Sequence, residues 1–375
     1  MAAVSGYLVS AEVDGLVERF FTVEDRFMDA NTPNFIIAAG VIKGREARLR
    51  NAFRGVASGM RGLDWVPEFR WIVGRYYVTL HRREPPRAST GRRNKLLLTA
   101  TVATVFLDGY IRSDNPVLTR ALMPGVPPAL NALIFTVGIL IVFGVHELGH
   151  KFLSERRGFR SSWPYFIPAP PGLGGTFGAV ISLEEQPTNR DDLFDLGLSG
   201  PVSGFLATLA VAVLGLFLSF TVTIDQVGSY LVAYPEIRFQ NIPMPLALDY
   251  IANSVRPTPA GGALVLHPLA FAAWVGCLVT FINLIPSWQL DGGHVVRALF
   301  GGETHKVVSV AGIFLMLISG YVIMGVLIAF FMMGEGKESL APLDDISPLD
   351  FKRKVFGTLF YVMLMGATLI SLIQI

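Results

Sequence analysis

The chain has 375 residues, of which 52% are hydrophobic and only 16% are charged. Together with a mean hydropathy of +0.50, this composition excludes an ordinary soluble globular protein and indicates a protein that crosses a membrane several times. The formal net charge of +2 is too small to indicate a nucleic-acid partner. The single cysteine, Cys277, excludes a disulfide framework and a cysteine-based zinc site.

Residues 1–95 predict a small soluble α+β domain. Mixed faces are typical of short helices, and runs rich in β-branched and aromatic residues are typical of strands. On this basis we expect helices at 14–21 and 45–57 and strands at 35–42 and 69–80. His81 is interpreted as a strand-end or surface residue. The basic, proline-bearing linker at 83–95 suits a tether on an anionic inner membrane surface, and no signal peptide is visible, which predicts a cytosolic N-terminal domain.

Residues 96–375 predict a polytopic α-helical membrane domain of about six transmembrane helices. The apolar segments lie near 96–111, 129–150, 197–220, 268–286, 307–333 and 355–375. Basic residues before the first segment and after the second place the N-terminus on the inner side. Alternation of the spans then puts the loop at 334–354 outside, although it carries four lysines and arginines. The orientation of the last two spans is therefore left open.

The second apolar segment carries the most informative motif of the chain. An uncharged run from 130 to 145 leads directly into His146-Glu147-Leu148-Gly149-His150. His146 and His150 are four residues apart, so they share one helix face and can bind one metal ion. Glu147 lies beside them and can act as a base toward a metal-bound water. Ionisable residues at membrane depth are costly, which favours a functional site here.

A catalytic zinc site needs a third protein ligand, and the fourth apolar segment supplies a candidate. Asp291 follows that segment at the same inner end as the two histidines, after Pro286 breaks the helix and before Gly292 and Gly293 allow a turn. The alternative is a helix-capping carboxylate at the membrane surface. Asn283 can donate a hydrogen bond to a substrate carbonyl or developing oxyanion, or it can pack between helices as a polar residue.

The segment at 163–183 is too rich in proline and glycine to be a helix. Residues 176–183 predict a short strand, which either pairs with an extended substrate beside the metal or belongs to an ordinary cytosolic loop. His294 can touch the site, but we expect it to support the metal ligands from behind or to lie at an interface, whereas His267 and His305 are interpreted as bystanders. The acidic side chains that follow are interpreted as a solvated surface: Glu184, Glu185, Asp191, Asp192 and Asp195.

Taken together, these motifs resemble the site-2 protease family of intramembrane zinc metalloproteases, peptidase family M50. The resemblance rests on HELGH, on the spacing N-x-x-P-x-x-x-x-D-G from Asn283 to Gly292, and on the G-x-x-x-G of Gly200 and Gly204. GTFGAVISL and LFDLGLSGP further resemble the plant and cyanobacterial branch with a soluble N-terminal domain. No PDZ-like insertion is apparent, which departs from the bacterial branch that carries one.

The resemblance implies a three-helix catalytic core at about 129–300. It also implies that His146, His150 and Asp291 bind one Zn²⁺ per chain, that Glu147 is the catalytic acid and base, and that Asn283 binds substrate. The implied chemistry is hydrolysis of peptide bonds within or near transmembrane segments, which is regulated intramembrane proteolysis.

Two alternatives from other classes stay open. One is a membrane zinc-binding protein or transporter that uses the same three ligands, although transport needs no base beside a histidine and internal repeats are not seen. The other is an inactive homologue that acts as a membrane chaperone, against which the intact motif argues. The expected partners are transmembrane protein substrates and the lipid bilayer, with no nucleic acid, and the expected location is a prokaryotic plasma membrane.

Overall fold

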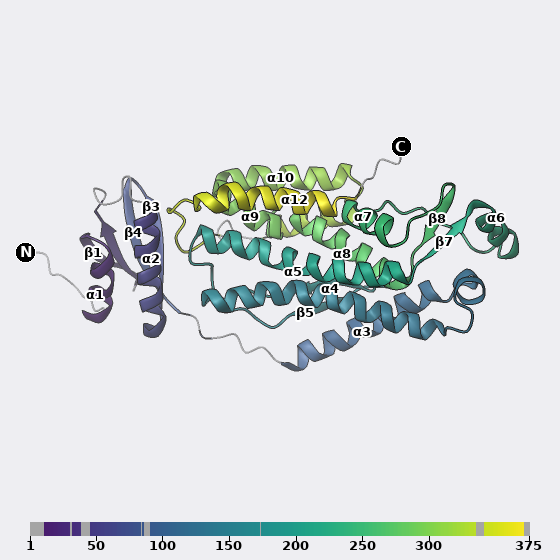
Figure 1. Cartoon of the computed structure of the whole chain (residues 1–375). Coiled ribbons are helices and arrows are strands. Elements are labelled where there is room, and N and C mark those ends of the chain that lie inside the picture. The colour runs from purple at the N-terminus through teal and green to yellow at the C-terminus, as the bar shows by residue number, and fades with distance from the viewer. Residues whose placement is uncertain are drawn as a thin grey trace, which may run out of the picture.

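The computed structural model describes residues 11–30, 32–38, 46–83, 85, 91–172, 174–334 and 341–370. An N-terminal α+β unit lies at one end of a bundle of long helices, and small strands and short helices lie at the other end (Figure 1).

The N-terminal unit is an antiparallel sheet with the strand order β1-β2-β4-β3, packed against two helices. Its elements are α1 (Ala11–Phe20), β1 (Val23–Asp29), β2 (Thr32–Ile37), α2 (Glu46–Met60), a 3₁₀ turn (Arg61–Leu63), β3 (Trp65–Ile72) and β4 (Arg75–Arg82). Phe35, Phe53 and Phe69 are fully buried between the sheet and the helices. An α+β fold was therefore correctly expected for this part of the chain.

Two details of this unit differ from the expectation. The single strand predicted at 69–80 is a hairpin, because the chain turns at Val73 and Gly74, both of which have positive φ. The strand β1 was not predicted, because its sequence VEDRFMD lies at the sheet edge with most side chains exposed and shows no apolar alternation. His81 lies near the end of β4 and is half-exposed beside Glu68, as expected.

Among the described residues, three helices are long and apolar enough to cross a membrane: α3 (Gly91–Ser113), α4 (Pro128–Arg157) and α5 (Arg190–Phe217). At 30 residues, α4 is about 45 Å long. Two shorter apolar helices, α8 (Pro268–Leu284) and α11 (Val322–Gly334), accompany them. The α-helical membrane class is thus supported, whereas the count of six spans and the domain boundary at residue 95 stay predictions.

The remaining elements connect and cover these helices. They are a π-helical turn (Val117–Leu122), β5 (Tyr165–Pro168), β6 (Thr176–Val180), β7 (Phe220–Thr223), α6 (Ile224–Ala233), α7 (Leu246–Val255), β8 (Gly262–Val265), α9 (Asp291–Phe300), α10 (Gly302–Ile318), a second π-helical turn (Arg353–Gly357) and α12 (Thr358–Thr368). The pair β7–β8 and the helix α6 lie at the end far from the N-terminal unit (Figure 1).

The apolar segment predicted as one span at 307–333 is two packed helices. The chain breaks between α10 and α11 at Gly320, whose φ is 86°. A Cβ at Gly301, just before α10, would lie 3.3 Å from the Arg190 guanidinium. After α11, the Leu343 amide donates to the Pro187 carbonyl at 2.9 Å. Since 187 and 190 are neighbours, α11 returns the chain to the side from which α10 left.

This return explains the basic loop at 334–354. Its described residues 341–354 lie on the same side as the N-terminal unit, which is where Lys352, Arg353 and Lys354 belong under the positive-inside rule. The outside placement that alternation of six spans required was wrong, because a 27-residue apolar stretch gives no signal for a hairpin when a single glycine makes the turn.

Residues 341–350, here called the C-terminal strap, join the N-terminal unit to the helix bundle. The Phe69 amide of β3 donates to the Leu343 carbonyl at 2.8 Å, and the Asp344 amide donates to the Thr188 carbonyl at 2.9 Å. Asp344 forms parallel bridges with Phe69 on one side and Asn189 on the other. The strap therefore extends the edge of the N-terminal sheet toward the start of α5.

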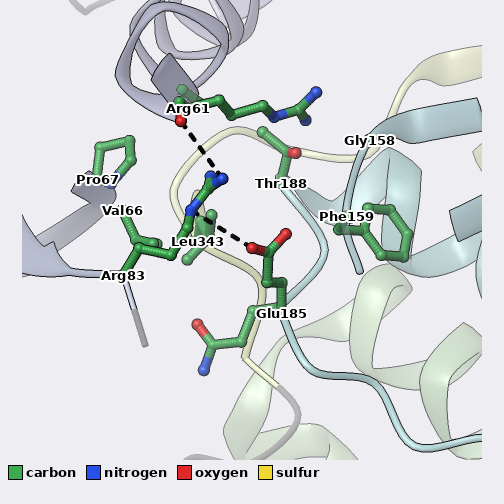
Figure 2. A pocket seen from close by; sticks show the side chains of 11 residues that line it. Arg61, Val66, Pro67, Arg83, Gly158, Phe159, Glu185, Thr188 and Leu343 are labelled. Atoms are coloured by element: carbon green, nitrogen blue, oxygen red, sulfur yellow. Dashed lines mark hydrogen bonds and ion pairs between the residues drawn. The ribbon is translucent and has the colours of Figure 1, made fainter. Parts of the chain in front are cut away.

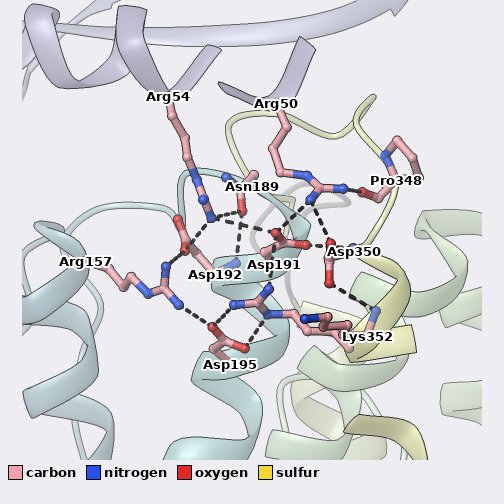
Figure 3. Close-up of polar contacts among 11 residues, drawn as sticks. Arg50, Arg54, Arg157, Asn189, Asp191, Asp192, Asp195, Pro348, Asp350 and Lys352 are labelled. Carbon is pink, nitrogen blue, oxygen red and sulfur yellow. Dashed lines mark hydrogen bonds and ion pairs between the residues drawn. The ribbon is translucent and has the colours of Figure 1, made fainter. Parts of the chain in front are cut away.

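Ion pairs fasten the same junction, and we call them the docking network (Figure 3). Asp191 and Asp192, at the start of α5, are 2% and 3% exposed and face Arg50 and Arg54 of α2. The network also includes Arg157, Asp195, Asp350 and Arg353. The interpretation of Asp191, Asp192 and Asp195 as a solvated surface was wrong, because their partners come from distant parts of the chain.

A small pocket of about 30 Å³ lies beside this network, between the N-terminal unit and the loop before α5 (Figure 2). Within it, Arg83 contacts Glu185 at 3.4 Å and the Arg61 carbonyl at 3.4 Å. Arg160 holds the same Glu185 at 2.8 Å. Glu185 is thus also paired rather than solvated.

Candidate active site

His146, His150 and Asp291 meet at one point inside the helix bundle. The Nε2 atom of His146 lies 3.1 Å from Oδ2 of Asp291, and Nε2 of His150 lies 3.2 Å from Oδ1 of the same carboxylate. The two Nε2 atoms are 3.3 Å apart. Both histidines are less than 10% exposed. The structure therefore brings together the three residues that the sequence analysis selected as metal ligands.

The spacing of these atoms fits a tetrahedral metal ion. Zinc bonds to histidine nitrogen and carboxylate oxygen are about 2.0–2.2 Å long, and a tetrahedron with bonds of that length has edges of about 3.3–3.6 Å. The 3.3 Å between the two Nε2 atoms matches such an edge, and each Nε2 lies 3.1–3.2 Å from one of the two carboxylate oxygens of Asp291. Two nitrogens and one oxygen are also a donor set that catalytic zinc sites use, with the fourth position left for water or substrate.

The outer nitrogen of His150 is already engaged by the helix α5. Its Nδ1 atom lies 3.0 Å from the Leu196 carbonyl, to which the ring N–H donates, and 3.2 Å from Oγ of Ser199. Such a hydrogen bond fixes the tautomer and leaves Nε2 as the nitrogen that can bind a metal. The orientation of His150 is therefore set before any metal binds.

Glycines on α5 make room for both histidine rings. A Cβ at Gly200 would overlap the ring of His150, and a Cβ at Gly204 would lie 2.9–3.0 Å from His146. A Cβ at Gly197 would lie 2.7 Å from the Asp291 carbonyl. A G-x-x-x-G pair such as Gly200 and Gly204 is typical of helices that pack closely against a neighbour. The structure shows that what packs against them is the metal-binding face of α4.

Asp291 reaches this point because it is the first residue of α9, after a tight loop at 285–290. Trp288 in that loop has a φ of 43°, a conformation that side chains other than glycine rarely adopt. The helix α10 holds the loop there. The Trp288 amide donates to Oγ of Ser309 at 2.9 Å, and the His305 ring lies 3.0 Å from the Trp288 carbonyl. His305 thus supports this loop from α10 and is not a member of the metal group.

Glu147 is buried next to His146, and its carboxylate accepts a hydrogen bond from the Ile181 amide at 3.0 Å. Ile181 directly follows β6, which pairs with β5 in an antiparallel hairpin. The strand predicted at 176–183 is thus present as β6, although it ends at Val180. One end of this hairpin touches the carboxylate that the sequence analysis selected as the base.

The other polar candidates are less directly connected. Asn283 is half-buried, one residue before the end of α8, and among the described residues no hydrogen bond joins it to the three ligands. Its role in substrate binding stays a prediction. His294 lies one turn after Asp291, and its Nδ1–H donates to the Leu290 carbonyl at 3.0 Å. His267 caps the start of α8 by accepting from the Leu269 amide, which is a structural role.

Comparison with known proteins agrees with the motif and its geometry. The profile of peptidase family M50 matches residues 134–327, which is more than half of the chain. The chain belongs to peptidase family M50. Within the match lie both histidines of α4, Glu147 and Asp291.

Among similar proteins, this M50 chain is 30% identical over 243 residues to the probable zinc metalloprotease EGY2, chloroplastic, of Arabidopsis thaliana. The alignment covers 64% of this chain and 40% of that protein. The probable zinc metalloprotease EGY1 of the same plant is 33% identical over 182 residues, or 48% of this chain and 31% of that protein. EGY3 of Oryza sativa subsp. indica is 28% identical over 62% of this chain and 41% of that protein.

The aligned part thus spans less than half the length of these relatives. All three carry the word chloroplastic in their names, so they give no support to the prediction of a prokaryotic plasma membrane.

Proposed function

We propose that this M50 chain is a zinc-dependent endopeptidase that cleaves peptide bonds within or near transmembrane segments of membrane proteins. The observation that carries the proposal is the meeting of His146, His150 and Asp291 beside Glu147, inside helices of apolar sequence. Buried ionisable groups of this kind are retained in a membrane domain when they serve a function. The relatives are named as zinc metalloproteases, and the donor set fits that metal.

A bound zinc ion would polarise the scissile carbonyl and make the attacking water more acidic. The chain itself must then move one proton twice. The hydrogen bond from the Ile181 amide occupies Oε2 of Glu147, so we assign the proton transfer to Oε1. Glu147 takes the proton from the attacking water and delivers it to the leaving amine. The Ile181 bond keeps the carboxylate oriented during both transfers.

The substrate would be held in an extended form by β6. A helical transmembrane segment hides its amides in internal hydrogen bonds, so it must unwind before cleavage. In the described part of the chain β6 pairs with one strand, β5, and a second extended segment can add to its other edge. Phe177 and Val180 are exposed on β6 and would contact apolar side chains of the substrate. Asn283 is kept as a candidate donor to the substrate backbone.

The proposed orientation places the N-terminal unit and the C-terminal strap on the inner side of the membrane, so that an even number of crossings separates them. A pocket of about 110 Å³ lies on that side. Glu184, Glu185 and His294 line it, and His294 is one turn from Asp291. We assign this pocket as the route by which water reaches the site. The proposal includes a location in a cellular membrane. It also includes the release of a membrane-tethered factor as the biological output.

The test compares wild type with Glu147→Gln on a single-span model substrate in lipid, with product masses as the readout. The wild type should cut inside the span, and the cut should vanish with chelator and fall at least about 1,000-fold in the variant. Glu155→Gln on the same helix is the matched control, because Glu155 is exposed and should leave the rate unchanged. Equal cutting by wild type and Glu147→Gln would refute the assignment of Glu147. Zinc binding without cutting by either protein would favour a transporter or chaperone.

A further inference from the structure

Another buried carboxylate lies in the apolar helix α3, away from the metal site. Asp108 is only 1% exposed, although the sequence around it is apolar. Its Oδ2 atom pairs with Arg112 one turn later at 2.6 Å, and its Oδ1 atom accepts from the Gly172 amide. Gly172 belongs to the proline- and glycine-rich turn between β5 and β6. Burying a carboxylate in an apolar helix is costly, which favours a function for its interactions with Arg112 and Gly172.

The same turn is held at a second point, one helical turn earlier on α3. The Thr104 hydroxyl donates to the Gly175 carbonyl at 2.7 Å, the shortest of its three possible bonds. A Cβ at Gly175 would lie 2.5–2.7 Å from the backbone of Thr104 and Val105. Only glycine therefore allows the turn to approach α3 so closely.

Arg112 completes the attachment. Its guanidinium lies 4.3 Å from the centre of the Phe271 ring of α8, and it contacts the Gly172 carbonyl at 3.4 Å. A cation over an aromatic face is favourable in an apolar environment. Asp108 and Arg112 therefore bind both the amide and the carbonyl of one residue in the turn, and they connect that turn to α3 and α8 together.

The hairpin β5–β6 is thus fixed at both ends. Its turn is attached to α3 through Asp108 and Thr104, and its far end donates from Ile181 to Glu147. Between these points lies β6, the strand that is proposed to pair with the substrate. Strands in a two-stranded ribbon have little stability of their own, so the position of β6 depends on these attachments.

From this arrangement we infer that Asp108 and Thr104 are positioning residues that hold β6 in register with Glu147, so that the scissile bond of a paired substrate lies at the metal. The inference rests on the proposed function. Neither residue touches the metal group; each acts through the hairpin. Loss of either attachment should allow the strand to move, which weakens substrate binding more than it slows the chemical step.

The first experiment reports on the hairpin and needs no proteolysis. Cys277 is the only cysteine, so Cys277→Ala gives a thiol-free background. Ala179→Cys then places a probe on β6, where the native side chain is 9% exposed. Labelling by a maleimide in lipid should be about tenfold faster when Asp108→Ala or Thr104→Val is added, because each loses a buried hydrogen bond. Asp108→Asn keeps an oxygen acceptor and should restore a rate closer to wild type.

Matched controls come from the same helix. Thr99→Val removes a hydroxyl that bonds only to its own helix at Lys95, and Asp114→Asn removes an exposed charge at the helix end. Neither should change the labelling rate. Thr104→Val is the milder of the two test changes, because it removes no charge. If both Thr104→Val and Asp108→Ala label as slowly as the control Thr99→Val, the positioning role is refuted.

The second experiment measures cleavage of the model substrate. Thr104→Val and Asp108→Ala should raise KM about fivefold or more and change kcat less than twofold, since each disturbs the strand rather than Glu147. Asp108→Asn, which keeps the acceptor, should give a KM closer to wild type. A fall in kcat at unchanged KM would overturn the inference. If no protein cuts, wild type included, but labelling still rises in the variants, the protease proposal fails while the attachment of the hairpin stands.

Discussion

Two of the clusters of polar side chains that the described residues bury, the metal group and the docking network, are built in opposite ways. The metal group has three members, is closely lined by glycines of α5 and lies among apolar helices. The docking network has eight charged members from five segments of the chain, and Arg54, Arg157 and Arg353 in it are each about a third exposed. The metal group tolerates almost no change of shape, because the histidine rings lie against the backbone of Gly200 and Gly204. The second shares each charge among several partners.

This difference predicts how each cluster responds to substitution. The metal group depends on sterics and on ligand identity, so a single methyl group in the wrong place should disable it. The docking network depends on charge that water and salt partly screen, so the loss of one member should weaken it gradually. Three substitutions test this contrast.

The largest effect is expected for Gly200→Ala. The added Cβ overlaps the ring of His150, so the histidine must leave its place and zinc affinity should fall about 100-fold or more. Competition with a chelator on the purified protein measures this. Gly366→Ala in α12 is the control, because a Cβ there meets open space, and it should keep full affinity. Unchanged zinc affinity in Gly200→Ala would show that the glycine serves helix packing alone.

A moderate effect is expected for Asp191→Asn. Its carboxylate lies 3.2 Å from Arg50 and accepts from the Asp350 amide at 2.9 Å, so docking of the N-terminal unit should weaken by about 2 kcal/mol. Amide hydrogen exchange in β3 and the strap should rise, and zinc content should not change. Asp29→Asn on the exposed edge strand β1 is the control. Loss of zinc in Asp191→Asn would contradict the independence of the two clusters.

The smallest effect is expected at the surface pair of Glu68 and His81. Their hydrogen bond at 3.1 Å raises the pKa of His81 and lowers the pKa of Glu68. Its contribution is therefore fully present above the ordinary glutamate pKa of 4.5 and below the ordinary histidine pKa of 6.5. It is lost as pH rises through the raised pKa of His81.

His81→Gln should thus destabilise the N-terminal unit by about 0.5 kcal/mol or less near pH 5.5, because the His81 side chain is half-exposed and water screens the pair. The difference should shrink at alkaline pH. Thermal unfolding followed across that range measures it. In a Glu68→Gln background the substitution at His81 should have no pH-dependent effect, and a persisting dependence would mean that another group is responsible.

The metal group could be selected from sequence because its signal is local and stands against an apolar background. His146, Glu147 and His150 lie within five residues, and Asp291 follows at a matching depth of another apolar segment. The residues that shape the site could not be selected in this way. Ser309 and His305 support the loop before Asp291 from a separate helix, and no pattern along the chain indicates that contact.

The docking network could not be predicted from sequence, in contrast to the metal group. Asp191 and Asp192 look like a solvated acidic surface when only their sequence neighbours are considered. Their burial depends on Arg50, which is 141 positions away along the chain, and on Asp350. Likewise, the hairpin of α10 and α11 depends on the turn at Gly320 and on the contacts of the strap with β3 and with the start of α5. Apolar periodicity locates helices, but contacts over long separations decide how they are arranged.

The C-terminal strap has a consequence for biosynthesis. A ribosome makes the N-terminal unit first, but the edge of β3 is paired with residues 343 and 344, which are made after α11. Until then the strand has an open edge with unpaired amides, a template for pairing with other chains. Closure of that edge therefore marks a chain whose metal-binding helices have already been made, and a truncated chain would expose it.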